Sequence, residues 1–187
     1  MLQSIVQSFN SPSFYIAVAA ITLHVVNYNA TAQLEHATRI FTKLLGHNAV
    51  YFYAVYLVVS ALIRDHFIQI ALIESSNSIS LPVVWVGQCL FVIGVLMNIW
   101  TLKALGIKGM YNGDSFGHLM DAPVTDGPYR YLNEPQYVGT SLCLLGSSLY
   151  YQSATGLVLT VIMYIVFMIS VTFVEAPHMK KLYAKKK

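Results

Sequence analysis

The residues best suited to chemistry gather in two polar stretches that interrupt a largely apolar sequence. The first stretch, residues 104–118, contains Asp114, Ser115 and His118 near its end. Its four glycines recur at spacings of three, four and four residues, at positions 106, 109, 113 and 117. On a helix, this spacing predicts one face without side chains. Such a face lets two membrane helices pack closely or lets a ligand lie against the backbone, and spacing alone does not choose between them.

The second stretch, residues 126–140, combines turn residues with polar side chains. Gly127-Pro128 indicates a turn, and Pro135 suits the first turn of a helix. An interfacial loop with aromatic anchors would explain this composition by itself. The stretch also gathers side chains that can contact charged ligands, namely Arg130, Asn133, Glu134 and Tyr137. A binding role therefore stands beside the structural one.

Glu175 is a third candidate, because it directly follows a long apolar run. A carboxylate at membrane depth is costly unless it has a partner or a function. A helix end in contact with water would remove that cost. The sequence leaves both interpretations of Glu175 open.

The elements that position these residues are apolar segments long enough to cross a membrane. Of the 187 residues, 56% are hydrophobic and 10% are charged, whereas soluble domains carry about 25% charged residues. Four runs contain no charged residue: 1–34, 44–63, 75–102 and 135–174. Each can cross a bilayer, which takes about 20 apolar residues. This composition excludes a soluble enzyme, a nucleic-acid-binding domain and a disordered tail, and it predicts one integral membrane domain over residues 1–187.

The four runs divide into five predicted helices, over residues 14–28, 49–63, 81–102, 137–151 and 156–174. The last two form a hairpin, because residues 152–156 have the composition of a tight turn. The fourth segment would be only about 22 Å long, less than a hydrocarbon core of about 30 Å. The predicted fold class is therefore all-α and integral to the membrane, with four to five transmembrane helices and a C-terminal helical hairpin. Either the first or the fourth segment is a candidate for a re-entrant one.

The positions of lysine and arginine predict an orientation, because these residues are retained on the cytosolic side. With the C-terminal tail in the cytosol, ten of the 11 lie on that side, and Arg64 alone lies outside. Both polar stretches and Glu175 would then meet at the cytosolic membrane face. The first apolar run lacks the features of a cleaved signal, and we expect it to remain in the membrane.

Cysteine and histidine add no metal or disulfide site to this prediction. Cys89 and Cys143 both lie in apolar runs and form no spaced framework. The histidines show no closely spaced pair, which disfavours a membrane di-iron oxidase. We expect no metal and no nucleic-acid partner.

Five motifs in chain order resemble membrane methyltransferases, a group that includes the isoprenylcysteine carboxyl methyltransferases and the phospholipid N-methyltransferases. The motifs are residues 34–39, 104–106, 112–117, 127–139 followed by Glu175, and Pro177 with Tyr183. The phosphatidylethanolamine and phosphatidyl-N-methylethanolamine N-methyltransferases are the better match. The resemblance covers nearly the whole chain.

The resemblance implies that a methyl group passes from S-adenosylmethionine to the amine head group of phosphatidylethanolamine or its mono- or dimethyl derivatives, leading to phosphatidylcholine. The family assigns a Gly-x-Gly to this methyl donor, and only its second glycine is kept here, in Val92-Ile93-Gly94. Of the family's acidic pair after the last helix, only the first acid is kept, in Glu175-Ala176. The candidate cofactor-binding residues are Val92, Ile93, Gly94, Gly106, Gly109, Arg130, Asn133, Tyr137, Glu175 and Ala176.

Three residues are the candidate catalytic groups for this chemistry: His118, Glu134 and Glu175. His118 is the preferred proton acceptor, since an unperturbed pKa of about 6.5 makes histidine a usable base at neutral pH. Either glutamate can offset the positive charge of the substrate ammonium or of the methyl donor. Arg130 or Lys108 can bind the lipid phosphate or the cofactor carboxylate.

The expected partner is a membrane phospholipid, and the expected location is the endoplasmic reticulum membrane, with contacts to mitochondria as a further option. Two rival functions remain open from the sequence. One is methylation of a prenylated cysteine carboxylate, which needs no amine base. The other is a non-catalytic helical membrane subunit, in which the glycines serve packing and the loop is an anchor.

Overall fold

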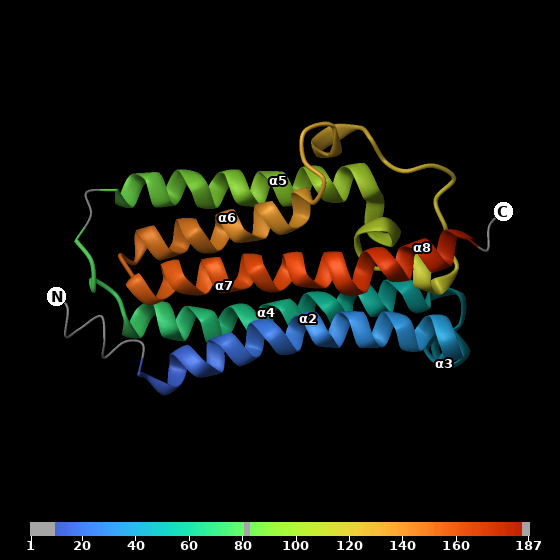
Figure 1. The fold of residues 1–187 in the computed structure, drawn as a ribbon, viewed down its shortest axis with the longest axis horizontal. Helices are drawn as coiled ribbons and strands as arrows, with labels where there is room; N and C mark the ends of the chain where they lie inside the picture. The colour runs from blue at the N-terminus through green and yellow to red at the C-terminus, as the bar shows by residue number, and fades with distance from the viewer. Residues whose placement is uncertain (1–9, 81–82, 185–187) are drawn as a thin grey trace.

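Five long helices run back and forth along one axis of the computed structural model, which describes residues 10–80 and 83–184 (Figure 1). They are α2 (Pro12–Thr38), α4 (Ala49–Glu74), α5 (Val84–Met110), α6 (Pro135–Tyr150) and α7 (Ala154–Ser170). The shorter elements are α3 (Ile40–Leu45), α8 (Ala176–Ala184), a π-helical turn (Val171–Glu175) and 3₁₀ turns at Gly46–Asn48, Gly113–Phe116 and Gly127–Arg130. Within the described residues every element is helical, which confirms the all-α prediction.

Successive long helices are antiparallel, so the chain reverses at two distinct ends of the bundle (Figure 1). One end carries the α4–α5 connection and the tight turn between α6 and α7. The other end carries α3, residues 111–134 and α8. The two polar stretches therefore lie toward the same end as the exit of the last long helix, as the sequence predicted.

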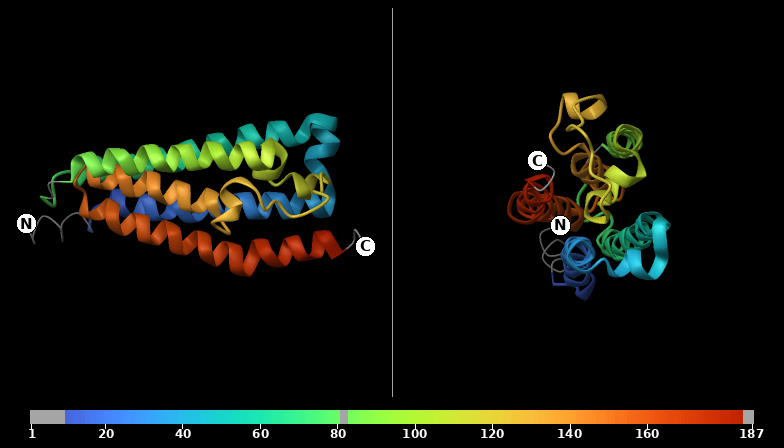
Figure 2. Two further views of the ribbon diagram at one scale, coloured as in Figure 1. Left: turned by 90° about the horizontal axis from the view of Figure 1, so that it is seen from above. Right: turned by 90° about the vertical axis from the view of Figure 1, so that its right-hand side faces the viewer.

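Viewed end-on, the helices follow one another around the bundle in the order α5, α6, α7, α2, α4 (Figure 2, right). α5 packs mainly on α6, and α2 packs on both α4 and α7. Few contacts join α4 to α5, so the ring is nearly open at that point. From above, α8 continues the direction of α7 after a bend (Figure 2, left).

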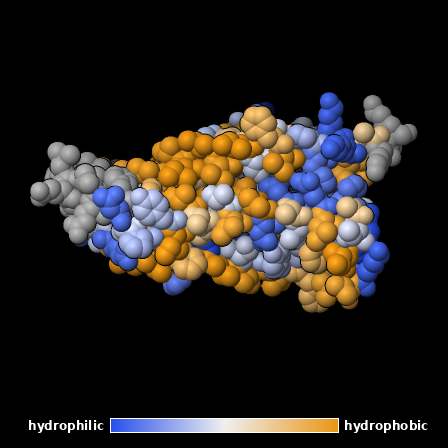
Figure 3. Space-filling view, turned by 60° about the horizontal axis from the view of Figure 1, so that its bottom comes forward, coloured by the Kyte–Doolittle hydropathy of each residue, from blue (hydrophilic) through white to orange (hydrophobic). Residues whose placement is uncertain are grey.

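In the part of the chain that the structure describes, three helical stretches are long and apolar enough to cross a membrane: Ile40–Glu74, Val84–Phe116 and Ala154–Ala184. α2 has 27 residues and is about 40 Å long, but its composition is less apolar. α6 has 16 residues, about 24 Å, and is short of the roughly 30 Å hydrocarbon core, as predicted for the fourth segment. On the face drawn in Figure 3, apolar side chains form large patches along the bundle, and hydrophilic side chains gather mainly toward the right-hand end.

The core lies where α2, α4 and α7 meet. Ile21, Leu72, Leu159 and Met163 are among its fully buried side chains. In a membrane, apolar side chains gain little by leaving lipid, which is equally apolar. These helices must therefore associate through close van der Waals packing of complementary surfaces. The α5–α6 pair packs against this group of three helices, mainly through the contact of α6 with α7.

The prediction that the second helix ends at Ile63 is wrong. α4 continues to Glu74, and the Arg64 side chain is buried in the bundle. Its Nε donates to Oδ1 of Asp65 at 2.8 Å, and its Nη2 lies 2.8 Å from the same oxygen. An arginine paired in this way is tolerated within a helix bundle, so its charge does not end the helix. The first helix also exceeds its predicted range, because it continues to Thr38.

The predicted glycine face over positions 106–117 is also wrong. Gly106 has φ +67 and kinks α5, which then ends at Met110. Gly113 lies in a 3₁₀ turn, and Gly117 has φ +89. Glycine reaches positive φ without steric cost, so these residues turn the chain where a continuous helix was expected. The expected start of the third helix at Leu81 lies outside the described residues, as do the lysines at 185–187.

Other glycines bring α5 and α6 into backbone contact. A Cβ atom at Gly94 would lie 2.5 Å from the Gly139 carbonyl oxygen, and one at Gly87 would lie 2.6 Å from that of Gly146. These pairs recur every seven residues along each helix. Small residues at such spacing allow membrane helices to approach closely. Close approach fixes the position of α6 and of the loop that precedes it.

We predict that Gly94→Val destabilises the protein by about 1–3 kcal/mol, because the added carbons overlap the α6 backbone. The measurement is the unfolding midpoint in detergent, followed by size exclusion. Leu96→Phe is the matched control, since Leu96 on the same helix is 59% exposed and its enlarged side chain meets only lipid or detergent. Equal unfolding midpoints for the two variants would contradict the packing role of Gly94.

Candidate active site

Glu175 is the centre of a hydrogen-bond cluster at the π-helical turn between α7 and α8. Its carboxylate accepts three hydroxyl hydrogen bonds. Tyr28 donates to Oε1 at 2.6 Å, Ser170 donates to Oε1 at 2.7 Å, and Tyr137 donates to Oε2 at 2.7 Å. The donors belong to α2, α7 and α6, so one carboxylate connects three helices. Single π turns occur often at functional sites, and this one aims Glu175 into the bundle.

The groups around Glu175 hold its donors in place. The Tyr28 and Tyr137 hydroxyl oxygens lie 3.0 Å apart, and Asn29 donates from Nδ2 to Ser170 Oγ at 2.7 Å. The Tyr137 ring stacks on Phe167 with centroids 4.6 Å apart. Both tyrosines are therefore fixed by ring packing and by hydrogen bonds. This arrangement was not predicted for Tyr28 or Ser170.

A polar cavity of about 300 Å³ lies beside the two tyrosines. All five long helices contribute to its lining. Its polar lining residues are His24, Tyr28, Arg64, Asn98, Tyr111, Asn112, Gln136, Tyr137 and Thr140. Asn98 Oδ1 is buried and has no hydrogen-bond partner among the described residues. A buried acceptor without a donor is costly, so this atom is suited to a ligand that brings one.

Glu134 lies directly before α6 and is partly buried. Burial raises the pKa of Glu134 to about 7, and the negative charge of Glu175 adds to this increase. Burial also raises the pKa of the nearby Tyr129 phenol to about 12, with a further contribution from Glu134. The two carboxyl groups are therefore electrostatically coupled. Two acids that share a site favour either a proton or a bound cation between them.

Neither glutamate has a basic partner within residues 10–80 and 83–184. The ion pair found there joins Arg64 to Asp65. At the end of the bundle where the polar stretches lie, neither acid of the pair is therefore in ion-pair contact with a described basic side chain. The chemistry of this pair fits a positively charged ligand.

His118 has Lys108 as its polar neighbour. Its Nδ1 is 3.4 Å from the Lys108 ammonium, and like Glu134 and Glu175 it does not line the polar cavity. Burial lowers the pKa of His118, and the positive charge of Lys108 lowers it further. Both effects favour the neutral imidazole, whose Nδ1 can accept a hydrogen bond from Lys108. The Lys108 ammonium also lies 5.9 Å from the centre of the Tyr51 ring.

The other predicted site residues are spread over several places. Arg130 and Asn133 are exposed on the loop before α6, and Ala176 is exposed at the start of α8. On α5, Val92 and Ile93 are exposed, while Gly94 contacts α6. Gly106 forms the kink in α5, and Gly109 lies against the Met120 side chain. Glu134, Tyr137 and Glu175 are the predicted residues that the structure brings together, and the roles of the rest stay predictions.

The tail helix α8 is fastened to the turn that follows α5. The Tyr183 hydroxyl donates to Asp114 Oδ1 at 2.6 Å and accepts from the Met120 amide at 3.0 Å. Ser115 Oγ lies 3.1 Å from His178 Nε2. Two motifs that are far apart in the sequence, residues 112–117 and the tail, therefore meet. Their contact holds α8 in place, directly after the π-helical turn that carries Glu175.

Comparison with known proteins identifies the family of this chain. A family model described as phospholipid methyltransferase matches residues 82–186. This chain belongs to the phospholipid methyltransferase family. No solved structure matches it.

Curated relatives match this phospholipid methyltransferase over most of its length. Phosphatidylethanolamine N-methyltransferase B of Dictyostelium discoideum is 56% identical, over 94% of this chain and 90% of its own. Phosphatidyl-N-methylethanolamine N-methyltransferase of Emericella nidulans is 31% identical, over 95% and 89%. The human phosphatidylethanolamine N-methyltransferase is 31% identical, over 94% and 90%.

We predict that Glu134 of this methyltransferase is half-ionised near pH 7 and that Glu175→Gln lowers its midpoint. Removing the Glu175 charge relieves repulsion of the Glu134 carboxylate, while burial keeps the midpoint above the ordinary value for glutamate. Infrared titration of the carboxyl band with labelled glutamate measures this, and Glu134→Gln identifies the band. A midpoint that is unchanged in Glu175→Gln would show that the two acids are not coupled.

Proposed function

We propose that this protein transfers a methyl group from S-adenosylmethionine to the amine head group of phosphatidylethanolamine or its mono- or dimethyl derivatives, leading to phosphatidylcholine. The observation that carries the proposal is the pair of acids, Glu134 and Glu175, beside a polar cavity and without a basic partner among the described residues. The names of the relatives support the same reaction.

The residues around the cavity fit S-adenosylmethionine, which supplies an activated methyl group on a positively charged sulfonium. Glu175 would hold positive charge, and the Tyr28 and Tyr137 hydroxyls already orient its carboxylate. The unpartnered Asn98 Oδ1 would accept a hydrogen bond from a polar group of the donor. A carboxylate and a cation about 4 Å apart attract by about 4 kcal/mol at an effective dielectric constant near 20.

The acceptor amine must lose a proton before its lone pair can attack a methyl carbon. Glu134 is placed to take that proton, because its pKa of about 7 lets it both accept and release a proton near neutral pH. When Glu134 is ionised, it also attracts the ammonium form of the head group. His118 is the alternative acceptor that the sequence suggested, and its contact with Lys108 places it at the same end of the bundle.

The acid pair favours this reaction over its two rivals. Methylation of a prenylated cysteine carboxylate would bring a negative acceptor to a site that already carries two acids, and like charges repel. A non-catalytic subunit would have no need for a buried acceptor without a donor or for acids without a basic partner. Failure of the purified protein to bind S-adenosylmethionine would favour the subunit.

We predict that Glu134→Gln lowers the rate of methyl transfer by about 10²–10⁴-fold, the usual contribution of a positioned base. In the wild type the rate rises with pH through about 7, because Glu134 must be ionised to accept a proton, and this limb disappears in Glu134→Gln. The assay uses purified protein, labelled methyl donor and each acceptor lipid separately.

Asp126→Asn is the matched control for that assay, since Asp126 is an exposed acid in the same loop and its side chain caps no helix. We expect it to retain wild-type rates. His118→Ala is measured in parallel. Loss of activity in His118→Ala with near-normal rates in Glu134→Gln would assign the proton to His118 instead.

We further propose that the protein lies in the endoplasmic reticulum membrane, including regions in contact with mitochondria, with its C-terminus in the cytosol. The described basic residues outside the bundle core support this orientation, because Arg39, Lys43, Lys103, Lys108, Arg130, Lys180 and Lys181 belong to the segments at one end. In the described residues, the opposite end has no lysine or arginine. Positive residues are retained in the cytosol.

We predict that, in sealed microsomes, an impermeant maleimide labels Lys180→Cys directly and labels Ser76→Cys only after detergent is added. Both changes are made in a chain with Cys89 and Cys143 replaced by serine. Ser76 lies in the α4–α5 connection at the opposite end of the bundle. Labelling of Ser76→Cys alone before detergent would reverse the proposed orientation.

A further inference from the structure

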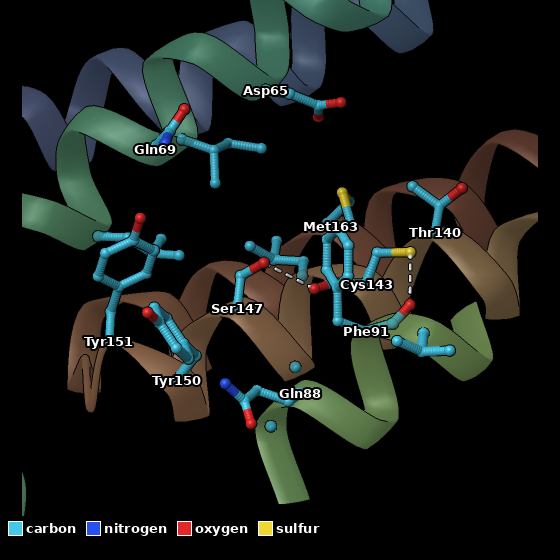
Figure 4. A pocket seen from close by; sticks show the side chains of 16 residues that line it. Asp65, Gln69, Gln88, Phe91, Thr140, Cys143, Ser147, Tyr150, Tyr151 and Met163 are labelled. Atoms are coloured by element: carbon cyan, nitrogen blue, oxygen red, sulfur yellow. Dashed lines mark hydrogen bonds between the residues drawn. The ribbon is translucent and has the colours of Figure 1, made fainter. Parts of the chain in front are cut away.

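A second and larger cavity, of about 680 Å³, lies between α4 on one side and α5, α6 and α7 on the other (Figure 4). Asp65 and Gln69 project toward it from α4, and Ser147 and Cys143 project from α6. The lining is mainly apolar, with Ile68, Leu72, Leu144 and Met163 among its residues. The acid pair is not part of this lining.

The burial of the lining residues shows that this cavity is a groove that opens sideways. Its floor is made of buried residues, among them Ile68, Leu144 and Met163. Asp65, Gln69, Gln88, Phe91 and Val92 form its exposed rim. The opening follows the place where α4 and α5 make few contacts. In a membrane, this opening faces the lipid chains.

The groove adjoins the polar cavity. Thr140 lines both, and Asp65 of the groove is paired with Arg64 of the polar cavity. Along α6 the groove extends from Thr140 to Tyr151, a rise of about 16 Å at 1.5 Å per residue. That length is close to half of a hydrocarbon core of about 30 Å. The groove therefore leads away from the acid pair toward the opposite end of the bundle, parallel to the direction of the lipid chains.

The walls of the groove are suited to an uncharged chain. The glycine contacts between α5 and α6 close its back. Asp65 and Arg64 neutralise each other at the junction with the polar cavity. A lipid chain in the groove is held by close packing against these walls, because the surrounding lipid is equally apolar.

We propose that this groove binds one acyl chain of the substrate phospholipid while its head group reaches the mouth of the polar cavity at Thr140, where the two cavities adjoin. The proposal rests on the proposed function. The groove is then the part of the site that discriminates between lipids by the length of their acyl chains. A lipid enters between α4 and α5, where the ring of helices is nearly open. The chain then holds the amine at a fixed depth beside Glu134 and Glu175.

The test fills the groove and compares long-chain and short-chain forms of one acceptor lipid. Ser147→Phe places a ring in the groove from α6, and Gln69→Trp does so from the exposed rim of α4. We expect each to lower kcat/KM for the sixteen-carbon lipid by about tenfold or more relative to the six-carbon lipid, about 1.4 kcal/mol of binding. The KM for S-adenosylmethionine stays at its wild-type value.

Val161→Phe is the matched control, because Val161 is 58% exposed on α7 and lines neither cavity. We expect it to leave the ratio of the two lipids unchanged. If both groove variants fold and the ratio stays at its wild-type value, the groove does not hold the substrate chain and the proposal is wrong. An equal loss of kcat/KM for both lipids would also contradict the proposal.

Binding separates this proposal from the proposed function. Native mass spectrometry of the delipidated protein measures retention of the long-chain lipid without turnover. Retention by the wild type and its loss in Ser147→Phe, without methyl transfer by either protein, would support the groove and overturn the proposed function. Methyl transfer by the wild type with equal lipid retention in all variants would support the function and overturn the groove.

Discussion

A carboxylate held between helices at a membrane boundary must find hydrogen-bond donors, and in this protein Glu175 finds three hydroxyl groups. Because the donors come from α2, α6 and α7, satisfying one acid also fixes the relative positions of three helices. The π-helical turn provides the extra residue that aims the carboxylate inward. The arrangement of the polar cavity follows from this requirement, since Tyr28 and Tyr137 serve both as donors to Glu175 and as cavity walls.

The hydrogen bonds satisfy the oxygen atoms of Glu175 but leave its charge without a counter-ion. Glu134 places a second acid nearby, and the raised pKa of its carboxyl group reflects both burial and this neighbour. A site of this kind gains free energy when a cation enters. A phospholipid methyltransferase handles a sulfonium donor and an ammonium acceptor together, so an acidic site reduces the repulsion between its own ligands. The larger groove extends the same site into the region where lipid chains lie.

Hydropathy was sufficient to predict the all-α fold, the C-terminal hairpin and the meeting of the polar stretches, because each depends on where apolar runs begin and end. It could not predict the length of α4, since the ion pair with Asp65 compensates the charge of the buried Arg64. Nor could the glycine spacing reveal positive φ at Gly106 and Gly117. Asn98 and Tyr28 were missed, although each is a polar residue inside an apolar run. That signal, considered by itself, would have indicated a functional interior.

If Glu175 holds positive charge from the methyl donor, its replacement must affect a charged ligand more than an uncharged one. Calorimetry gives the affinities of S-adenosylmethionine, which carries the sulfonium charge, and of S-adenosylhomocysteine, which lacks it, for the wild type and for Glu175→Gln. We predict that Glu175→Gln weakens the binding of S-adenosylmethionine more than that of S-adenosylhomocysteine, because only the first loses an attraction between charges. Equal weakening of both ligands, or no weakening of either, would contradict it.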